Sequence, residues 1–264
     1  MLNKYYFLND QDTIRFIDFL KYEYFNSRSN VSGLLNQYRW PDNTKGLDFE
    51  ETFQKVSAMR IQIKNAVNKR NEYGVYEISS DILNWGGVGV ATKNIRVLES
   101  FKKERRLLDV IREARTLIRS SLLDMEQFRL PVNSGFSKIY TLLDDHFIIY
   151  DSRVAAKMCN LVKKCFGSNP ETLSLGKCDF QAKVNRDPGP EFPMLTGRPA
   201  RYFESNLKAA WILEKLALEH NPLNYPVDKT IFAYQTALFV DGYELQLQVG
   251  ETGYSGSGQA HPLH

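Results

Sequence analysis

Apolar residues recur at helical spacing along most of this chain, which predicts a mainly α-helical protein. The pattern is longest over residues 48–69, 152–166, 199–220 and 228–241. A further helix is predicted to begin near residue 12, and a short one is predicted between residues 79 and 85. Polar or glycine-containing loops are predicted at residues 26–33, 41–46 and 71–74, and the irregular stretch 167–198 is read as a long loop.

Residues 101–123, FKKERRLLDVIREARTLIRSSLL, predict a helix with an apolar face and a stripe of arginines. At about 100° per residue, Arg105, Arg112, Arg115 and Arg119 fall within an arc of roughly 80°. Most such stripes are solvated helix faces. Phosphate binding is the alternative reading, because the stripe comes just before the segment that carries the candidate chemistry.

That segment is 130–154, LPVNSGFSKIYTLLDDHFIIYDSRV. It predicts a tight turn over residues 131–135, a short helix from residue 137, and an apolar extended run over 147–150 that ends at Asp151. An aspartate at a helix start is a good N-cap, so a purely structural role is one reading. The other reading is a functional carboxylate, held in place by the buried run before it.

Composition and charge are those of an ordinary globular protein and do not indicate a particular function. The chain has 264 residues, with 12% aromatic and 25% charged residues, as ordinary globular proteins do. A formal charge of +3 permits nucleic-acid binding but does not require it. No run of residues is long and apolar enough for a membrane span, and three cysteines leave one unpaired, so we expect a cytoplasmic protein without disulfides, metal or cofactor.

A glycine-rich segment, WGGVGV, follows the short helix that ends at Trp85. Its spacing has neither the G-x-G-x-x-G series nor a GK[ST] ending, which excludes a nucleotide-binding loop. Two readings stay open for Gly86 and Gly87. They stop the helix in a left-handed conformation, or they let a nucleic-acid backbone approach closely while Trp85 lines a pocket for a base.

The residues Ser134 to Lys138, followed by Tyr150 to Val154, resemble a motif of the helix-hairpin-helix DNA glycosylases. In that superfamily a hairpin G-x-G-x-K leads through a helix to an apolar strand and then to V-D-x-x-V. Here Gly135 is the single hairpin glycine, the segment between lysine and aspartate is shorter, and no cluster-binding cysteines follow. WGGV, SGFSKIYTLL, FIIYDSRVA and ALFVDGY extend the resemblance over residues 80–245, to a bacterial branch with an oxoguanine-glycosylase fold.

The resemblance implies a helix-hairpin-helix glycosylase-like fold and assigns roles to particular residues. We expect an N-terminal helical region at 1–75, a glycosylase-like core at 76–249 and a flexible tail at 250–264. Asp151 is the expected catalytic carboxylate, and Lys138 is either a nucleophile or a phosphate partner. The expected DNA-binding residues are Ser134, Gly135, Phe136, Ser137 and Arg153, with Arg112 and Arg119 from the arginine stripe. The expected base pocket is formed by Trp85, Gly86 and Gly87.

The implied function is a DNA glycosylase that flips and excises a modified base in antiphage defence or base repair. The branch includes an enzyme that removes α-glucosylated hydroxymethylcytosine from phage DNA, so that base is the substrate the resemblance suggests. Abasic-site lyase activity depends on the role of Lys138. The alternative is a DNA-binding module without catalysis, and a weaker third reading is a nuclease or toxin. DNA is the expected partner, with no membrane and no obligate protein partner.

Overall fold

The computed structural model describes residues 1–40, 46–88, 93–167, 169, 172–178 and 187–242. The predicted tail at 250–264 lies outside these residues. In the described part the chain is mainly helical, as the periodicity predicts. The only strands there are β1 (Leu2–Asn3) and β2 (Leu122–Leu123), which pair antiparallel.

The helices follow one another with short connections over the first half of the chain. They are α1 (Lys4–Asn9), α2 (Gln11–Phe19) with a π-helical extension (Leu20–Tyr24), α3 (Arg28–Gln37), α4 (Phe49–Asn68), α5 (Glu72–Trp85), α6 (Lys93–Lys103) and α7 (Leu107–Arg119). A 3₁₀ turn (Met125–Gln127) precedes α8 (Ser134–Leu143), α9 (Ser152–Phe166), α10 (Pro199–Glu219) and α11 (Val227–Asp241).

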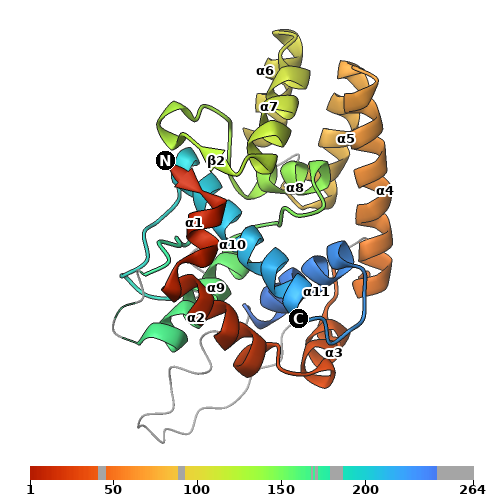
Figure 1. Cartoon of the computed structure of the whole chain (residues 1–264). Helices are drawn as coiled ribbons and strands as arrows, with labels where there is room; N and C mark the ends of the chain where they lie inside the picture. The colour runs from red at the N-terminus through yellow and green to blue at the C-terminus, as the bar shows by residue number, and fades with distance from the viewer. Residues whose placement is uncertain (41–45, 89–92, 168, 170–171, 179–186, 243–264) are drawn as a thin grey trace, which may run out of the picture.

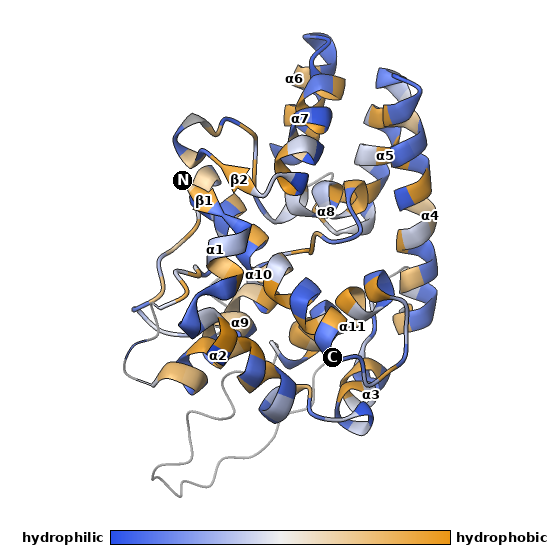
Figure 2. Cartoon of the chain, viewed as in Figure 1, coloured by the Kyte–Doolittle hydropathy of each residue, from blue (hydrophilic) through white to orange (hydrophobic). Residues whose placement is uncertain are grey.

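The helices pack in two groups, with the candidate segment between them. In one group α4, α5, α6 and α7 stand side by side, and α4, α5 and α7 contact α8 (Figure 1). In the other, α9, α10 and α11 pack together with α1, α2 and α3. Helix α11 also contacts α4, and Figure 2 shows hydrophobic residues gathered along α9 and α11. The chain passes from the first group to the second between α8 and α9.

Four predicted elements differ from the structure. The loop predicted at residues 26–33 is mostly the first part of α3, which begins at Arg28 because the Ser27 side chain caps it by accepting from the Asn30 amide. The stretch read as a loop over residues 71–74 is the start of α5, because Asn71 caps that helix by accepting a hydrogen bond from the Gly74 amide at 3.0 Å. The single helix predicted over 101–123 is broken between α6 and α7, where Arg105 has a φ of +54°. Helix α8 begins at Ser134, three residues earlier than predicted, after the cap Asn133.

The apolar run 147–150 is buried, as predicted, but it forms no strand. Side chains satisfy its backbone instead. The Ile149 amide donates to Gln235 Oε1 at 2.8 Å, and the Tyr150 carbonyl accepts from the Tyr202 hydroxyl. The Tyr150 hydroxyl in turn donates to the Gly176 carbonyl at 2.9 Å. These bonds hold the residue before Asp151 in the interior.

Candidate active site

A cavity of about 560 Å³ opens where the two helix groups meet. Its size lies within the ~300–1,000 Å³ range of typical ligand pockets. The start of α8 contributes Lys138, the start of α9 contributes Asp151 and Arg153, and the end of α5 contributes Trp85. The other lining residues include Trp40, Asn84, Gly86, Gly87, Asn133, Ser134, Ser152, Cys178, Thr196, Tyr202 and Phe239.

Asp151 is both the cap of α9 and a wall of the cavity. Its Oδ1 accepts hydrogen bonds from the amides of Arg153 at 3.0 Å and Val154 at 3.2 Å. This cap uses Oδ1 alone, so it fixes the carboxylate while Oδ2 takes no part in it. The two readings of Asp151 are therefore compatible, because one oxygen serves the helix and the group still borders the cavity.

Lys138 reaches the same cavity from a buried position on α8, where the residue is 2% exposed. Its Nζ donates to the Ser134 carbonyl at 3.0 Å. Burial lowers the pKa of its ammonium group from the usual 10.5, and the negative charge of Asp151 opposes that shift. Among the described residues no carboxylate lies within ion-pair distance of Lys138. A buried amine without a salt bridge is a candidate nucleophile, since the neutral form is the reactive one.

Gly86 gives the stem of Lys138 room. A Cβ atom at Gly86 would lie 2.3 Å from Lys138 Cδ and 2.8 Å from Lys138 Cε. Gly87 has a φ of +65° directly after α5, so the helix-stop reading holds for it. Both glycines border the cavity, and the close approach at Gly86 is to a side chain of the protein itself.

Aromatic rings form one wall of the cavity. Trp40 and Trp85 stack with ring centroids 4.8 Å apart and planes 25° apart, and Trp40 Nε1 donates to the Trp85 carbonyl at 3.0 Å. Phe239 lies against Trp40 at 5.6 Å, and the Arg153 guanidinium lies 4.3 Å from the centre of the Phe239 ring. Sequence reasoning found Trp85 but missed Trp40 and Phe239. Two of the three tryptophans in the chain line one cavity, and only the fold reveals this.

The amides expected to grip phosphate are occupied. Asn133 Oδ1 accepts from the amides of Gly135 at 2.8 Å and Phe136 at 3.1 Å, and the Ser137 amide donates to the Asn133 carbonyl at 2.9 Å. Gly135, Phe136 and Ser137 are also buried. The expectation of free N–H donors at this helix start is therefore wrong, because the Asn133 cap already uses them. Of the expected hairpin contacts, Ser134 alone lines the cavity.

The arginine stripe lies elsewhere. Arg112 and Arg119 border a different cavity, between α7 and the end of α4, and neither lines the cavity of Asp151. Arg105 precedes α7 and so stands outside the stripe. Arg153 is the one predicted basic contact that shares the cavity with Lys138 and Asp151.

The cysteines and the comparisons add no further assignment. Cys159, Cys165 and Cys178 are free thiols, and no cluster of potential metal ligands occurs among the described residues. No described helix combines the length and apolar character needed to cross a bilayer. Comparison of the chain with protein-family models, curated proteins and solved structures gave no match.

Proposed function

We propose that this protein is a DNA glycosylase that excises a modified base. One observation carries the proposal: the buried amine of Lys138 and the fixed carboxylate of Asp151 border one aromatic-walled cavity. The resemblance of residues 134–138 and 150–154 to the glycosylase motif supports the same chemistry. A base flipped out of the DNA stack needs a pocket with flat rings on which to stack, and Trp40 and Trp85 supply such rings.

Excision breaks the bond between sugar C1′ and the base nitrogen. The bonding electrons leave with the base, and positive charge develops on the sugar. A carboxylate beside C1′ stabilises that charge, which is the role proposed for Asp151. A water molecule then adds to C1′ and loses a proton, which leaves an abasic site. Asp151 suits this role because its two hydrogen bonds to the start of α9 use Oδ1 alone and hold the carboxylate in place.

Lys138 gives the site a second route. A neutral amine at Nζ adds to C1′ as the base departs, and ring opening gives a Schiff base between the lysine and the sugar. The lowered pKa of Lys138 supports this route because it raises the fraction of neutral amine at physiological pH. The proposed enzyme is then a glycosylase with abasic-site lyase activity.

The substrate class proposed is a bulky modified cytosine of phage DNA, with α-glucosylated hydroxymethylcytosine as the specific candidate. A cavity of about 560 Å³ provides room beyond that needed for an unmodified base. The side chains of Asn84, Ser134 and Thr196 on its border offer hydrogen bonds of the kind that a sugar hydroxyl accepts and donates.

The test compares wild type with Asp151→Asn on modified and unmodified phage DNA. We expect free modified base from the wild type and a large loss in the variant, of the order of 100-fold or more, because the charge-stabilising group is removed. Equal release by the two proteins, or release by neither, contradicts the proposal. DNA binding by both proteins without release of any base would favour the non-catalytic binding module.

Trapping with borohydride tests the role of Lys138 separately. We expect a covalent protein–DNA adduct in the wild type and none in Lys138→Ala. Base release without any adduct in the wild type would restrict the activity to the hydrolytic route and leave Lys138 without a nucleophilic role.

A further inference from the structure

A second cavity, of about 500 Å³, lies between α7 and the end of α4. Four arginines border it, together with Val67, Asn68 and Thr116, and no carboxylate is among the described residues that line it. We call this cavity the arginine pocket; its arginines are Arg70, Arg112, Arg115 and Arg119. Like charges gathered in one concave site repel one another, so an anion bound there would stabilise the arrangement.

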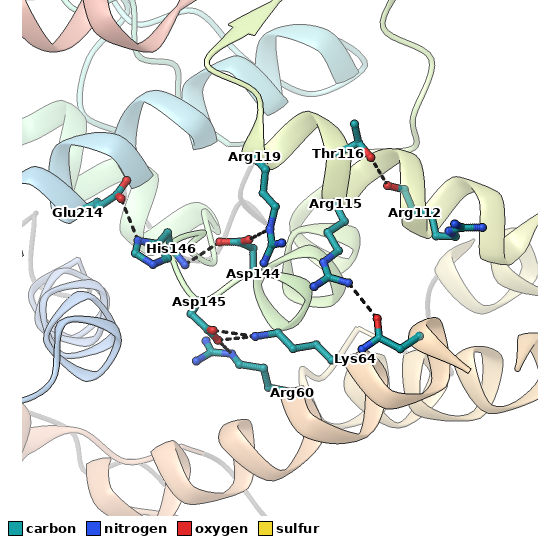
Figure 3. A network of polar contacts seen from close by, with 11 residues as sticks. Arg60, Lys64, Arg112, Arg115, Thr116, Arg119, Asp144, Asp145, His146 and Glu214 are labelled. Atoms are coloured by element: carbon teal, nitrogen blue, oxygen red, sulfur yellow. Dashed lines mark hydrogen bonds and ion pairs between the residues drawn. The ribbon is translucent and has the colours of Figure 1, made fainter. Parts of the chain in front are cut away.

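Only one of these four arginines forms an ion pair with a carboxylate among the described residues. Arg119 Nε lies 2.6 Å from Asp144 Oδ2, a buried carboxylate at the end of α8 (Figure 3). The neighbouring Asp145 is already shared by Arg60 at 3.0 Å and Lys64 at 2.7 Å. About three positive charges of the arginine pocket are therefore left for a ligand.

Arg115 gives an independent reason to place an anion in the pocket. One of its terminal nitrogens donates to a neutral acceptor, Asn68 Oδ1, at 3.3 Å. Its Nε is shielded from solvent and has no hydrogen-bond partner. A buried guanidinium donor without an acceptor is costly, and a phosphate oxygen would satisfy it.

The spacing of the arginines fits a chain of phosphates better than a single one. Arg112, Arg115 and Arg119 lie on one face of α7, and at ~1.5 Å per residue they cover about 10 Å. Successive phosphates of one strand rise about 3.4 Å along a DNA axis and also wind around it, so they lie roughly twice that distance apart in space and the row of arginines spans about two of them. Arg70 faces this row from beyond the end of α4, across the pocket.

We propose that the arginine pocket binds consecutive phosphates of one nucleic-acid strand, at a site separate from the cavity of Lys138 and Asp151. The choice of nucleic acid over a free polyphosphate rests on the proposed glycosylase function. The two sites lie toward opposite ends of α8: Lys138 is in its first half, and Asp144, the partner of Arg119, follows its last residue. Asp144 lies six residues after Lys138, which is about 9 Å along the axis of α8, so the strand would be held a few nucleotides from the flipped base.

The test is the salt dependence of binding to an unmodified DNA duplex, for wild type and for the double variant Arg112→Gln/Arg115→Gln. Each lost phosphate contact lowers the slope of log affinity against log salt by about 0.9, so the double variant should lose about 1.8. Between about 50 and 200 mM salt, wild type should then lose about tenfold more affinity than the double variant. Arg28→Gln, at an exposed position that begins α3, is the matched control and should keep the wild-type slope.

A double variant with the slope of Arg28→Gln overturns the proposal. So does a double variant that keeps its DNA slope but loses binding of inorganic tripolyphosphate, because the ligand would then be a free polyanion. The single variant Arg70→Gln should lower the slope by about 0.9. If the double variant does not fold, an unchanged slope in Arg70→Gln overturns the proposal. The duplex carries no modified base, so these outcomes are independent of whether the protein excises one.

Discussion

Replacing Lys138 by methionine should make the protein more stable. Lys138 is 2% exposed, has no carboxylate partner among the described residues, and has a lowered pKa because burial disfavours its charge. Methionine keeps an unbranched stem of similar length and carries no charge. Replacing a buried ion pair with apolar residues of similar volume is often neutral or stabilises a fold by about 1–4 kcal/mol, and a buried charge without such a partner has less to offset its desolvation. The hydrogen bond to the Ser134 carbonyl is lost at a cost of about 1 kcal/mol, so we expect a net gain of up to about 3 kcal/mol at neutral pH.

The gain should shrink as the pH rises. The unfolded chain binds a proton at Lys138 up to pH values near the ordinary pKa of 10.5, whereas the folded protein releases it at a lower pH. Over that window the unfolded state holds more protons, so the stability of the wild type increases with pH. The cost of Lys138 is complete below its folded pKa and disappears as the pH approaches 10.5.

Urea denaturation of wild type and variant at several pH values between neutral and alkaline measures this difference. Lys157→Met is the matched control, since Lys157 is also buried but its Nζ lies 2.5 Å from Asp241 Oδ2. That variant removes the ion-pair partner of Asp241, which keeps the hydrogen bond from the Tyr24 hydroxyl at 2.7 Å, and should lose about 1–3 kcal/mol. If Lys138→Met is destabilised like Lys157→Met, with a difference that does not change with pH, the view of Lys138 as a buried amine kept for chemistry is wrong.

Three other predictions concern groups around the site and the helix groups. Gly86→Ala should destabilise the protein by about 1–3 kcal/mol and suppress borohydride trapping, because the new Cβ would overlap the Lys138 stem. Adding Lys138→Ala to this variant should restore the stability, and a failure to do so refutes the contact. Asn133→Ala should cost about 1 kcal/mol in denaturation, since it frees two amides of α8; no change would show that the cap is dispensable. Asp145→Asn should destabilise the protein at pH 7. Partial burial raises the pKa of Asp145, but Lys64 and Arg60 outweigh this effect and hold the pKa below its usual 3.8. The difference in stability between wild type and variant should therefore fade as the pH falls below that value, and a difference that persists there contradicts the ion pairs.

Much of the helical pattern could be predicted from periodicity and caps. Helix α4 follows Asp48, which forms a capping box with Glu51, and α9 ends before Gly167, so both bounds were readable in the sequence. The break at Arg105 was not readable, because a left-handed arginine has no sequence signal of the kind that glycine provides. The start of α5 was missed since Gly74 was read as a loop residue, whereas it donates to the cap Asn71.

The candidate site was predicted in part. The sequence brought Lys138, Asp151 and Trp85 together as one hypothesis, and they border one cavity in the structure. The free amides at Gly135 to Ser137 were predicted wrongly, because Asn133, a residue type that commonly caps helices, was read as part of a turn over residues 131–135. Trp40 and Phe239 come from distant parts of the chain, and their contribution depends on tertiary packing that local patterns do not encode.

Mass spectrometry of the free bases released from several phage genomes shows directly whether the protein excises a modified base. Genomes with glucosylated hydroxymethylcytosine, with other modified bases and with ordinary bases are incubated with wild type and with Asp151→Asn. We expect one free modified base from the wild type, an excess of abasic sites in the same DNA, and little of either from the variant. Intact bases in every genome, or the same release from both proteins, would contradict this expectation.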